Sequence, residues 1–567
     1  GWSARPVQAA RGCGRRSEAL LCAPEPPRLR IATFNLLCPA YRRMSVRDDD
    51  VREAQFTAAF TARSERILEF EPLWSADIIC AQEFWYGNDK YFEQMVNRLE
   101  SRFRMHGMQR PRISATVSRP DGLFMAISRE WEVVREVDLD FEDAAGRCAQ
   151  VLHLRRVGST AAERGVASDS SDAEGFLVGE DVLYPSSEQG DLRRSLDTKT
   201  RRGGASVGDN AAGKENVVRS RLGALDGHAL QDHKPDIESA DGLAVEGDTE
   251  GEHIGGNQTR TIDEIIVANV HLLFPHNSAS IRIRLRQTHK LLCYLDEYKR
   301  SLPTGLPILV CGDLNGDSSS VVLRHLRRHG WEDTFATIKP EFPHWVSHMT
   351  HRGTAMGCDY ILLQNPSRPR QVVIPWTDVV FSEIAGELQS RGFKTPEQAW
   401  DYFASVASLG GGVSAAGFAQ ALFSLGFGGG TGKPTLTAVE VDMLANSCDV
   451  DGNGFIDSIE WCTRFSEALR RLRYRGLVRD APDCRADLKV VDAQIFPRCL
   501  EEGRWPQEAD GGWDLSDHGV VVSTFEAATT CGCSADTGVS DEDSPPAIEE
   551  EEGASLDVFG ELKMRSA

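Results

Sequence analysis

A layered α/β domain is the fold class that this 567-residue sequence predicts, and two patterns predict it. Short, β-prone apolar runs alternate with amphipathic stretches of helical period. Most of the apolar runs have one polar residue at one end, and layered α/β domains build their sites where strand ends meet loops. The chain is also long enough for more than one domain and for a large buried core.

The charge balance is acidic, because 63 Lys and Arg oppose 85 Asp and Glu for a net charge of −22. The acidic excess is concentrated in residues 157–260 and 527–567, which are polar and poor in aromatic residues. We expect both stretches to be disordered, the first as an insertion and the second as a tail. The remaining sequence is close to neutral, so the net charge does not exclude a polyanionic substrate.

Cysteine usage indicates a reducing compartment. The 14 cysteines form no CxxC pair of the metal-binding type, and several lie inside apolar runs, among them Cys80, Cys311 and Cys358. Buried free thiols are typical of intracellular proteins, so we expect the cytoplasm or the nucleus. The Arg-rich residues 1–29 are open between a transit peptide, which would direct the protein to an organelle, and a disordered segment. No apolar run approaches the roughly 20 residues that span a bilayer, so no transmembrane segment is expected.

Two early apolar runs end in polar residues. The run 30–37 has Asn35 near its end, and the run 76–85 stops at Gln82 and Glu83. A Glu directly after a buried run is usually a solvated strand end, so Glu83 alone is weak evidence for a ligand. We expect helices over 54–70, 280–298 and 319–329, and further strands over 119–127, 131–138, 148–155, 264–273, 307–311, 357–363 and 487–493, with a last apolar strand that Asp517 and His518 enter.

Later runs repeat the pattern. His271 ends the run 264–273, and the run 307–311 leads into a Gly turn with Asp313 and Asn315. Alternate residues of an extended backbone point the same way, so Asp313 and Asn315 are expected to face one site. Asp359 begins one further strand, and the sequence Ser516-Asp517-His518 precedes the last. Each residue alone also has an ordinary structural explanation, as a turn residue or a buried histidine.

Residues 449–460 match every position of a twelve-residue EF-hand loop, so we expect a calcium site there. The expected ligands are Asp449, Asp451, Asn453, the carbonyl of Phe455, Asp457 and the bidentate Glu460. EF-hands usually pair, and aligning Val413 with Ile456 defines an upstream loop over 406–417. That loop contains no carboxylate, so we predict a degenerate first loop that pairs with the loop 449–460 and binds no calcium.

Six short motifs occur in a fixed order: TFNLL at 33–37, QE at 82–83, NVHL at 269–272, GDLN at 312–315, DYI at 359–361 and SDH at 516–518. This ordered set resembles the endonuclease/exonuclease/phosphatase superfamily, which has the DNase-I-like fold. The motif sequences IATFNLLCPAY, AQEFW and GDLNGDSSSVV are most similar to those of the nocturnin and Angel-type deadenylase branch. The EF-hand insert resembles the calcium-binding members of the superfamily in plants and algae.

The resemblance implies a four-layer α/β (α+β) sandwich that hydrolyses a phosphate ester with Mg²⁺ or Mn²⁺. The implied ligands of Mg²⁺ are Asn35, Glu83 and Asp517. The implied catalytic residues are His271, Asp313, Asn315, Asp359, Asp517 and His518. A divalent ion on hard oxygen ligands suits this chemistry, because it neutralises the phosphate charge that repels a nucleophile.

The resemblance also implies roles. Asp313 would orient or deprotonate the attacking water, and Asn315 would donate to the phosphoryl oxygens. His518, hydrogen-bonded to Asp359, would stabilise the transition state or protonate the leaving group, and His271 would be a second histidine facing the phosphate. Which His or Asp is the general base stays open.

The expected organisation divides the chain into seven segments, three of which together build the hydrolase domain. They are a basic N-terminal segment (1–29), the first hydrolase segment (30–156), a disordered acidic insertion (157–260), the second hydrolase segment (261–376), an EF-hand pair (377–478), the third hydrolase segment (479–526) and an acidic disordered tail (527–567).

The expected function is hydrolysis of a phosphodiester, as an RNA 3′-exonuclease of the deadenylase type with a calcium-binding EF-hand. Whether calcium regulates hydrolysis or only stabilises the EF-hand module stays open. One alternative keeps the catalysis and changes the substrate to a nucleotide phosphate, a sphingolipid or abasic DNA. Another is a calcium-sensor scaffold with an inactive hydrolase domain. Inositol phosphatases of the superfamily have an aromatic–Arg pair after their GDxN motif, and Gly316-Asp317-Ser318 stands there instead. The oligomeric state is left open.

Overall fold

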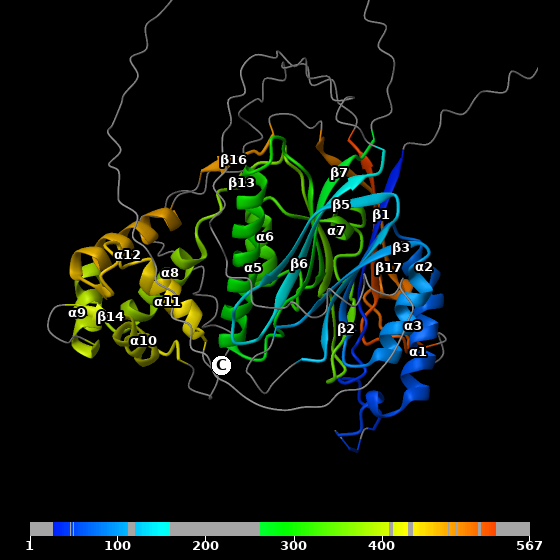
Figure 1. Ribbon diagram of the computed structural model, residues 1–567, viewed down its shortest axis with the longest axis horizontal. Coiled ribbons are helices and arrows are strands. Elements are labelled where there is room, and N and C mark those ends of the chain that lie inside the picture. Colours follow the sequence, from blue (N-terminus) through cyan, green and yellow to red (C-terminus); the bar gives the residue numbers. More distant parts are fainter. Residues whose placement is uncertain are drawn as a thin grey trace, which may run out of the picture. The chain divides into compact units, whose positions relative to one another are not determined.

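The structure, a computed structural model, describes residues 27–111 (except 46 and 49), 119–158, 261–407, 412–428, 435–473, 476–481, 486–507 and 512–528. The expected disorder of the insertion 157–260, of the tail 527–567 and of segment 1–29 falls almost entirely outside these residues. Within the described residues, two six-stranded sheets form the largest part of the fold (Figure 1).

The first sheet joins strands from both ends of the chain. Its order is β17 (Leu488–Phe496), β18 (Val520–Ala527), β1 (Arg28–Asn35), β2 (Ile78–Trp85), β4 (Asp121–Ser128) and β3 (Phe103–Gln109). β1 is parallel to β2, with Asn35 beside Gln82, and antiparallel to β18. The register therefore brings Asn35 and Glu83 to the same end of the sheet, next to the loop that enters β18.

The second sheet has the order β5 (Trp131–Asp140), β6 (Cys148–Arg156), β7 (Glu264–His271), β8 (Ile308–Asp313), β12 (Asp359–Gln364) and β9 (Glu332–Asp333). β7 is parallel to β8 with His271 beside Asp313, and β12 is antiparallel to β8 with Asp359 beside Asp313. Three of the expected site residues therefore lie side by side at one sheet end.

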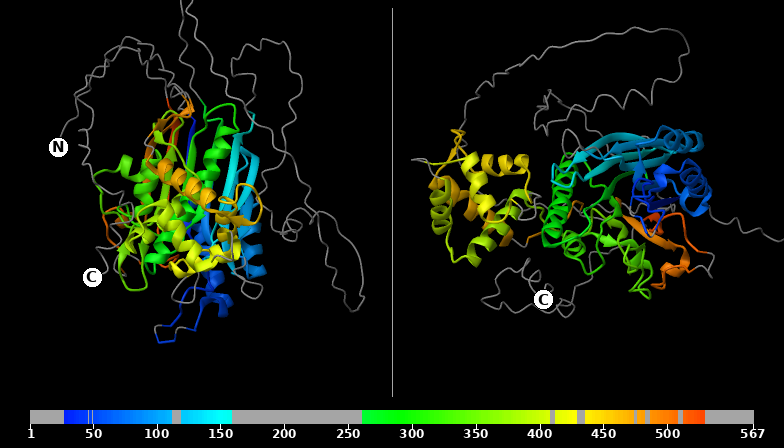
Figure 2. Two further views of the ribbon diagram at one scale, coloured as in Figure 1. Left: turned by 90° about the vertical axis from the view of Figure 1, so that its left-hand side faces the viewer. Right: turned by 90° about the horizontal axis from the view of Figure 1, so that it is seen from below.

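The two sheets face each other. β1 and β2 lie against β7 and β8, and apolar residues of both sheets, such as Ile31 and Val267, share one buried core. Helices cover the outer faces (Figures 1 and 2): α1 (Thr57–Glu69), α2 (Glu71–Trp74) and α3 (Asp89–Leu99) on the first sheet, and α5 (Ser278–Arg300) and α6 (Val321–Arg328) on the second. The short helix α7 (Thr334–Ile338) instead contacts β17 of the first sheet and β12 of the second. This arrangement is the four-layer sandwich that the sequence predicts.

Capping side chains explain where several helices begin. The side chains of Asn277 and Ser320 accept hydrogen bonds from backbone N–H groups in the first turns of α5 and α6. Such caps satisfy donors that have no partner within the helix. α3, which sequence reasoning missed, has the same device in Asn88.

A second group of helices lies in the chain between β13 (Arg370–Gln371) and β16 (Leu477–Val478). It comprises α8 (Trp376–Ser390), α9 (Pro396–Ala407), α10 (Ala415–Ser424), α11 (Ala438–Asn446) and α12 (Ser458–Arg473). These helices have a core of their own around Trp461. β13 and β16 are paired, so the chain leaves and returns at neighbouring points.

Two further short strand pairs are present among the described residues. β14 (Val413–Ser414) pairs with β15 (Phe455–Ile456), and Val413 is opposite Ile456 as the loop alignment predicts. β10 (His348–Met349) pairs with β11 (Ala355–Met356). None of the helices described here has the length and apolar character needed to cross a membrane.

Candidate active site

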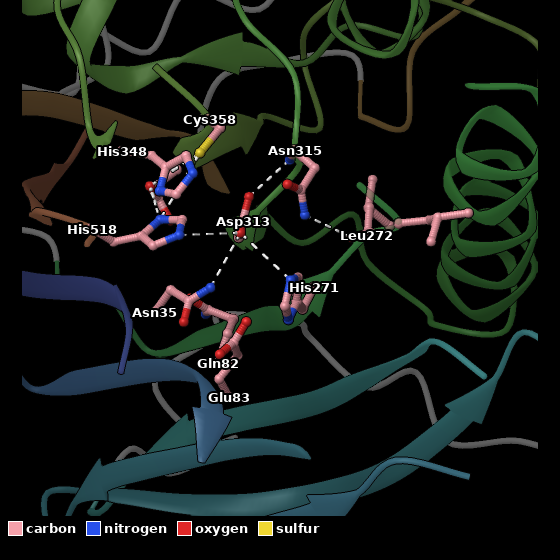
Figure 3. Close-up of polar contacts among 12 residues, drawn as sticks. Asn35, Gln82, Glu83, His271, Leu272, Asp313, Asn315, His348, Cys358 and His518 are labelled. Carbon is pink, nitrogen blue, oxygen red and sulfur yellow. Dashed lines mark hydrogen bonds and ion pairs between the residues drawn. The ribbon is translucent and has the colours of Figure 1, made fainter. Parts of the chain in front are cut away.

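Asp313 lies at the centre of the candidate site, at the end of β8 (Figure 3). Its Oδ2 atom is 3.2 Å from Asn35 Nδ2, 3.5 Å from His271 Nε2 and 3.8 Å from His518 Nε2. The preceding Gly312 permits this close approach of strands, because a Cβ there would stand 2.0 Å from the carbonyl oxygen of Val270. Burial and the neighbouring Asp359 raise the pKa of Asp313.

His518 lies in the loop before β18 and is held by Asp359. Its Nδ1 donates to Asp359 Oδ2 at 2.9 Å, and the same oxygen accepts a hydrogen bond from Ser347 Oγ at 2.7 Å. Although burial opposes it, the carboxylates of Asp359, Asp313 and Asp517 raise the pKa of His518 to about 10. His518 is therefore an imidazolium at neutral pH, and its Nε2–H is directed toward Asp313 (Figure 3).

His271 has the opposite character. Burial lowers the pKa of His271 well below its ordinary value, and Arg147 and Arg110 lower it further. The ring is therefore neutral at neutral pH. The site thus places a cationic histidine and a neutral histidine around the single carboxylate of Asp313.

Glu83 and Asn35 occupy the first sheet's side of the site. β2 has a bulge between Ala81 and Phe84, and Glu83 has a positive φ of 55°, which turns its side chain away from the regular strand alternation. Glu83 Oε2 accepts a hydrogen bond from the N–H of Cys38 at 3.0 Å. Burial, with the carboxylates of Asp121 and Asp517, raises the pKa of Glu83 to about 7.

Asp313 and Asn315 lie together as expected, but strand alternation is not what brings them together. The strand ends at Asp313, and Asn315 has a φ of 51°, so the two residues are not alternate members of one extended segment. They still meet, because the N–H of Asn315 donates to Asp313 Oδ1 at 2.8 Å. The side-chain Nδ2 of Asn315 donates to the carbonyl of Leu272 at 2.8 Å, which leaves one of its two N–H groups for another partner.

Sequence reasoning missed three residues of the site, since none belongs to a recognisable local motif. His348 stacks on His518 with ring centroids 4.1 Å apart, and its Nδ1 donates to the carbonyl of Asp517. The Nε and Nη1 atoms of Arg147 and Arg284 are buried without a hydrogen-bond partner among the described residues. Burial lowers the pKa of each arginine to about 10, and both interact electrostatically with Asp313.

A buried polar bridge joins the two sheets beneath the site. Gln82 Nε2 donates to Asn269 Oδ1 at 2.8 Å, and Asn269 Nδ2 donates in turn to the carbonyls of Ala81 and Phe124. Paired buried amides of this kind fix the register of the elements that they join, because an unpaired buried amide is costly. The Asn of the NVHL motif thus holds the sheets together.

The carboxylates of the expected calcium loop converge as well. Oxygens of Asp449, Asp451 and Glu460 lie within 4.8 Å of one another. Glu460 closes the loop, because its Oε1 accepts from the N–H of Val450 at 2.8 Å and its Oε2 from the N–H of Asp457 at 3.0 Å. Asp457 also caps α12 through the N–H groups of Ile459 and Glu460. Hard oxygen donors in this number fit Ca²⁺.

Two facing sheets with a buried group of carboxylates, amides and histidines at one end define a DNase-I-like hydrolase of phosphoester bonds. The sequence family described as the Endonuclease/Exonuclease/phosphatase family matches residues 32–386. The chain belongs to this family and is a hydrolase acting on phosphoester bonds. The match stops before β17 and β18, although these strands complete the first sheet.

Individual proteins are similar at lower levels. An uncharacterised calcium-binding protein of Arabidopsis thaliana is 26% identical over 516 residues, covering 87% of this chain and 83% of the relative. Among solved structures, the human Nocturnin catalytic domain with bound sulfate gives a TM-score of 0.33 at 12% identity, covering 61% of this chain and 86% of that one. ANGEL2, described as a 2′,3′-cyclic phosphatase, gives 0.34 at 12% identity, covering 61% and 85%. Truncated Caenorhabditis elegans TDP2 gives 0.32 at 10% identity, covering 61% and 88%.

Proposed function

We propose that the protein is a divalent-metal-dependent phosphodiesterase that removes nucleotides from the 3′ end of RNA. The observation that supports it most is the position of Asp313, between oxygen ligands on the first sheet and the His518–Asp359 pair. A water beside Asp313 has a carboxylate to orient it. The developing phosphoryl charge has a cationic imidazole on the other side.

The acidic side of the site fits Mg²⁺ or Mn²⁺. Glu83, Asp517 and the amide oxygen of Asn35 are hard oxygen donors, the type that these ions prefer. Glu83 resists ionisation where it stands, since burial and two further carboxylates raise its pKa to about 7. That cost disappears when a cation is present, so the residues fit the ion. A bound divalent ion supplies charge neutralisation at the phosphate.

The side chains divide the remaining work. Asp313 orients the attacking water and takes its proton, with neutral His271 at 3.5 Å to fix the carboxylate. His518 presents its Nε2–H to the phosphoryl or leaving-group oxygen, and the hydrogen bond from its Nδ1–H to Asp359 holds the ring in that orientation. The second N–H of Asn315 donates to the phosphate.

Arg147 and Arg284 contribute phosphate-binding groups that sequence reasoning overlooked. Their unpartnered guanidinium N–H groups are buried close to Asp313, and Nη1 of Arg284 lies against Gly316 in the next turn. Guanidinium groups bind phosphate oxygens in charge-assisted pairs. A phosphodiester substrate provides such oxygens, so the two arginines would find their missing partners in it.

The proposal of RNA rests on the wording of the motifs, which is most similar to the deadenylase branch. The test is release of AMP from 3′-labelled, A-tailed RNA with Mg²⁺, with an Asp313→Ala variant as the control. We expect processive release that the variant loses. If the enzyme acts on another substrate, it would release no AMP from RNA. It would instead hydrolyse a nucleotide phosphate, a sphingolipid or abasic DNA, and this hydrolysis would depend on Asp313. A scaffold with an inactive hydrolase domain would hydrolyse none of these.

We also propose that residues 377–478 are an inserted EF-hand pair in which only the loop 449–460 binds Ca²⁺, and that calcium modulates hydrolysis. Convergent carboxylates and the pairing of Val413 with Ile456 support this assignment. Calorimetric titration of the full chain with Ca²⁺ in excess Mg²⁺ should give one site. Two sites, or none, would contradict the proposal.

A further inference from the structure

Three histidines form a group on the outer side of the second sheet, away from the residues assigned to hydrolysis. His325 and His329 are four residues apart, on the last turns of α6 and at its end, and His289 is on the neighbouring α5. Nδ1 of His289 is 2.9 Å from Nε2 of His325. One nitrogen from each of the three rings falls within 4.8 Å of the others. A 3.6-residue helical period explains the pair on α6, which lies on one face.

Two backbone carbonyls fix how the rings are turned. Nε2 of His289 lies 2.8 Å from the carbonyl oxygen of Ile374, and Nδ1 of His329 lies 3.1 Å from that of Gln371. A carbonyl only accepts, so the ring nitrogen next to it must be the N–H. The lone pairs of His289 and His329 are then on Nδ1 and Nε2. Protein metal sites orient their imidazole ligands in the same way, with the second nitrogen donating to a carbonyl.

The three rings also have the protonation state of ligands. Burial lowers the pKa of His289 and of His329 to about 4, and it lowers that of His325 as well. Neutral imidazoles are the form that binds metal.

We propose that His289, His325 and His329 bind one transition-metal ion of the zinc type. Three nitrogen donors match the histidine-rich sites of Zn²⁺, in which metal–nitrogen bonds of about 2.0–2.1 Å set ligand atoms roughly 3.3 Å apart. The set excludes Mg²⁺ and Ca²⁺, which require oxygen ligands.

The surroundings define the kind of site further. No carboxylate or thiolate joins this group among the described residues. The nearest acidic influence on His329 is Asp296, which is already paired with Arg370 and Arg300. Three neutral ligands leave the ion its positive charge, so a water or hydroxide completes the fourth position and the affinity is moderate for a zinc site.

The position suggests what the ion does. The carbonyls of Gln371 and Ile374 belong to the segment between β13 and α8, which leads from the sandwich into the helical segment. A metal ion bound by the three histidines would connect α5 and α6 to that segment. An ion bound by the folded chain would add its binding free energy to the stability of the folded state.

The test uses the full chain, stripped of metal with a chelator and titrated with Co²⁺ in saturating Mg²⁺ and Ca²⁺. We expect one equivalent of Co²⁺ to produce the visible absorption of a nitrogen-rich, four-coordinate site, and one equivalent of Zn²⁺ to remove it. The variant His325→Gln should bind at least about 100-fold more weakly, because loss of even an outer hydrogen bond costs 10–100-fold. The exposed His351→Gln variant is the matched control and should bind normally.

Two measurements keep the outcome decisive. His518→Gln should retain the absorption, since His348, Asp517 and His518 form a separate group able to take a metal. If the absorption survives in His325→Gln and vanishes in His518→Gln, the ion is in the active site and the proposal is wrong. The wild-type protein should also gain melting temperature with Zn²⁺ in excess Mg²⁺. No absorption and no gain would show that the histidines are only a packed, neutral core group, whatever the folding of the variants.

Discussion

The active site and the calcium loop both gather carboxylates, but they hold them in different ways. Asp313 and Asp359 are buried, and their partners come from strands and loops far apart in the sequence. Asp449 and Asp451 receive their hydrogen bonds from backbone N–H groups of the same twelve-residue loop. The first group therefore exists only when the sandwich is complete, whereas the second is encoded locally.

This difference governs the electrostatics. Buried charges without bulk water interact strongly, and the active site accordingly contains a glutamate with a pKa raised to about 7 and a histidine with a pKa raised to about 10. The loop carboxylates interact instead with solvent and with backbone dipoles. Substitutions in the active site should therefore alter pH profiles as well as rates, whereas substitutions in the loop should alter only calcium affinity.

The largest effect is expected from Asp359→Asn. This change removes the charge that raises the pKa of His518 and weakens control of its tautomer. We expect kcat to fall about 10³-fold to 10⁴-fold, the range seen when the orienting carboxylate of a catalytic histidine is lost. The alkaline limb of kcat/KM, set by deprotonation of His518 near pH 10, should move toward neutral pH. Rates between pH 6 and 10 measure both effects, and an unshifted alkaline limb would contradict the role of His518.

A smaller effect, on binding alone, is expected from Glu460→Gln in the loop. The change removes the negative charge and one of the two oxygens of the residue that closes the loop over Val450 and Asp457. Calcium affinity should fall on the order of 100-fold, since EF-hand affinity follows ligand charge. Calorimetry measures the loss, and Mg²⁺-dependent hydrolysis without Ca²⁺ should be unchanged. A large loss of calcium-free hydrolysis would mean that the two regions are not independent.

The same contrast explains what could be predicted from the sequence. The calcium ligands of the loop 449–460 are predicted position by position, because they follow one another in twelve residues. Asn35, Glu83, Asp313 and His518 were found only through an ordered set of weak motifs. Sequence reasoning missed Arg147, Arg284 and His348, because a single Arg or His acquires its neighbours only through tertiary folding.

The placement of Asn315 shows the limit of period-based reasoning. Strand alternation predicts correctly that Asp313 and Asn315 are neighbours, but for the wrong reason. The backbone at Asn315 is left-handed, not extended. The same applies to Glu83, whose exit from β2 depends on a bulge. Bulges and left-handed residues re-aim side chains at functional sites, and the local sequence does not specify them.

The Mg²⁺ activation constant is expected to change about tenfold per pH unit below pH 7. Below pH 7, Glu83 is protonated in the metal-free site, so a proton competes with the ion and the Mg²⁺ activation constant rises as pH falls. Between pH 4.5 and 7 the folded protein retains a proton that the unfolded chain has released. Metal-free stability therefore declines as pH rises through this window, and Mg²⁺ should raise the melting temperature more at pH 8 than at pH 6.

The variant Glu83→Gln is the control for that prediction. It should abolish the difference between pH 6 and pH 8 in the Mg²⁺-dependent melting temperature, because its side chain does not titrate. It should also melt higher than the wild type at pH 8 without metal. An unchanged pH dependence in the variant would assign the proton to another group of the site.

The smallest effect is expected for calcium on hydrolysis itself. Lys290 on α5 forms an ion pair with Glu440 of α11 at 2.8 Å and donates to the carbonyl of Phe141 at 2.6 Å. The same helix α5 presents Arg284 to the active site, so a shift of α11 on calcium binding reaches a phosphate-binding residue through one rigid element. We expect Ca²⁺ to change kcat/KM about fivefold, the lower end of the usual range of coupling between sites.

Rates at nanomolar and at high micromolar free Ca²⁺, in saturating Mg²⁺, measure this coupling. Glu460→Gln should shift the response to higher Ca²⁺, whereas Lys290→Gln should leave calcium affinity intact and reduce the response. Equal rates at both calcium levels in the wild type would make the loop a structural site only. Because α5 also bears His289, an ion bound by the three histidines should stiffen this helix and weaken the same response, which adding Zn²⁺ to the rate measurement tests directly.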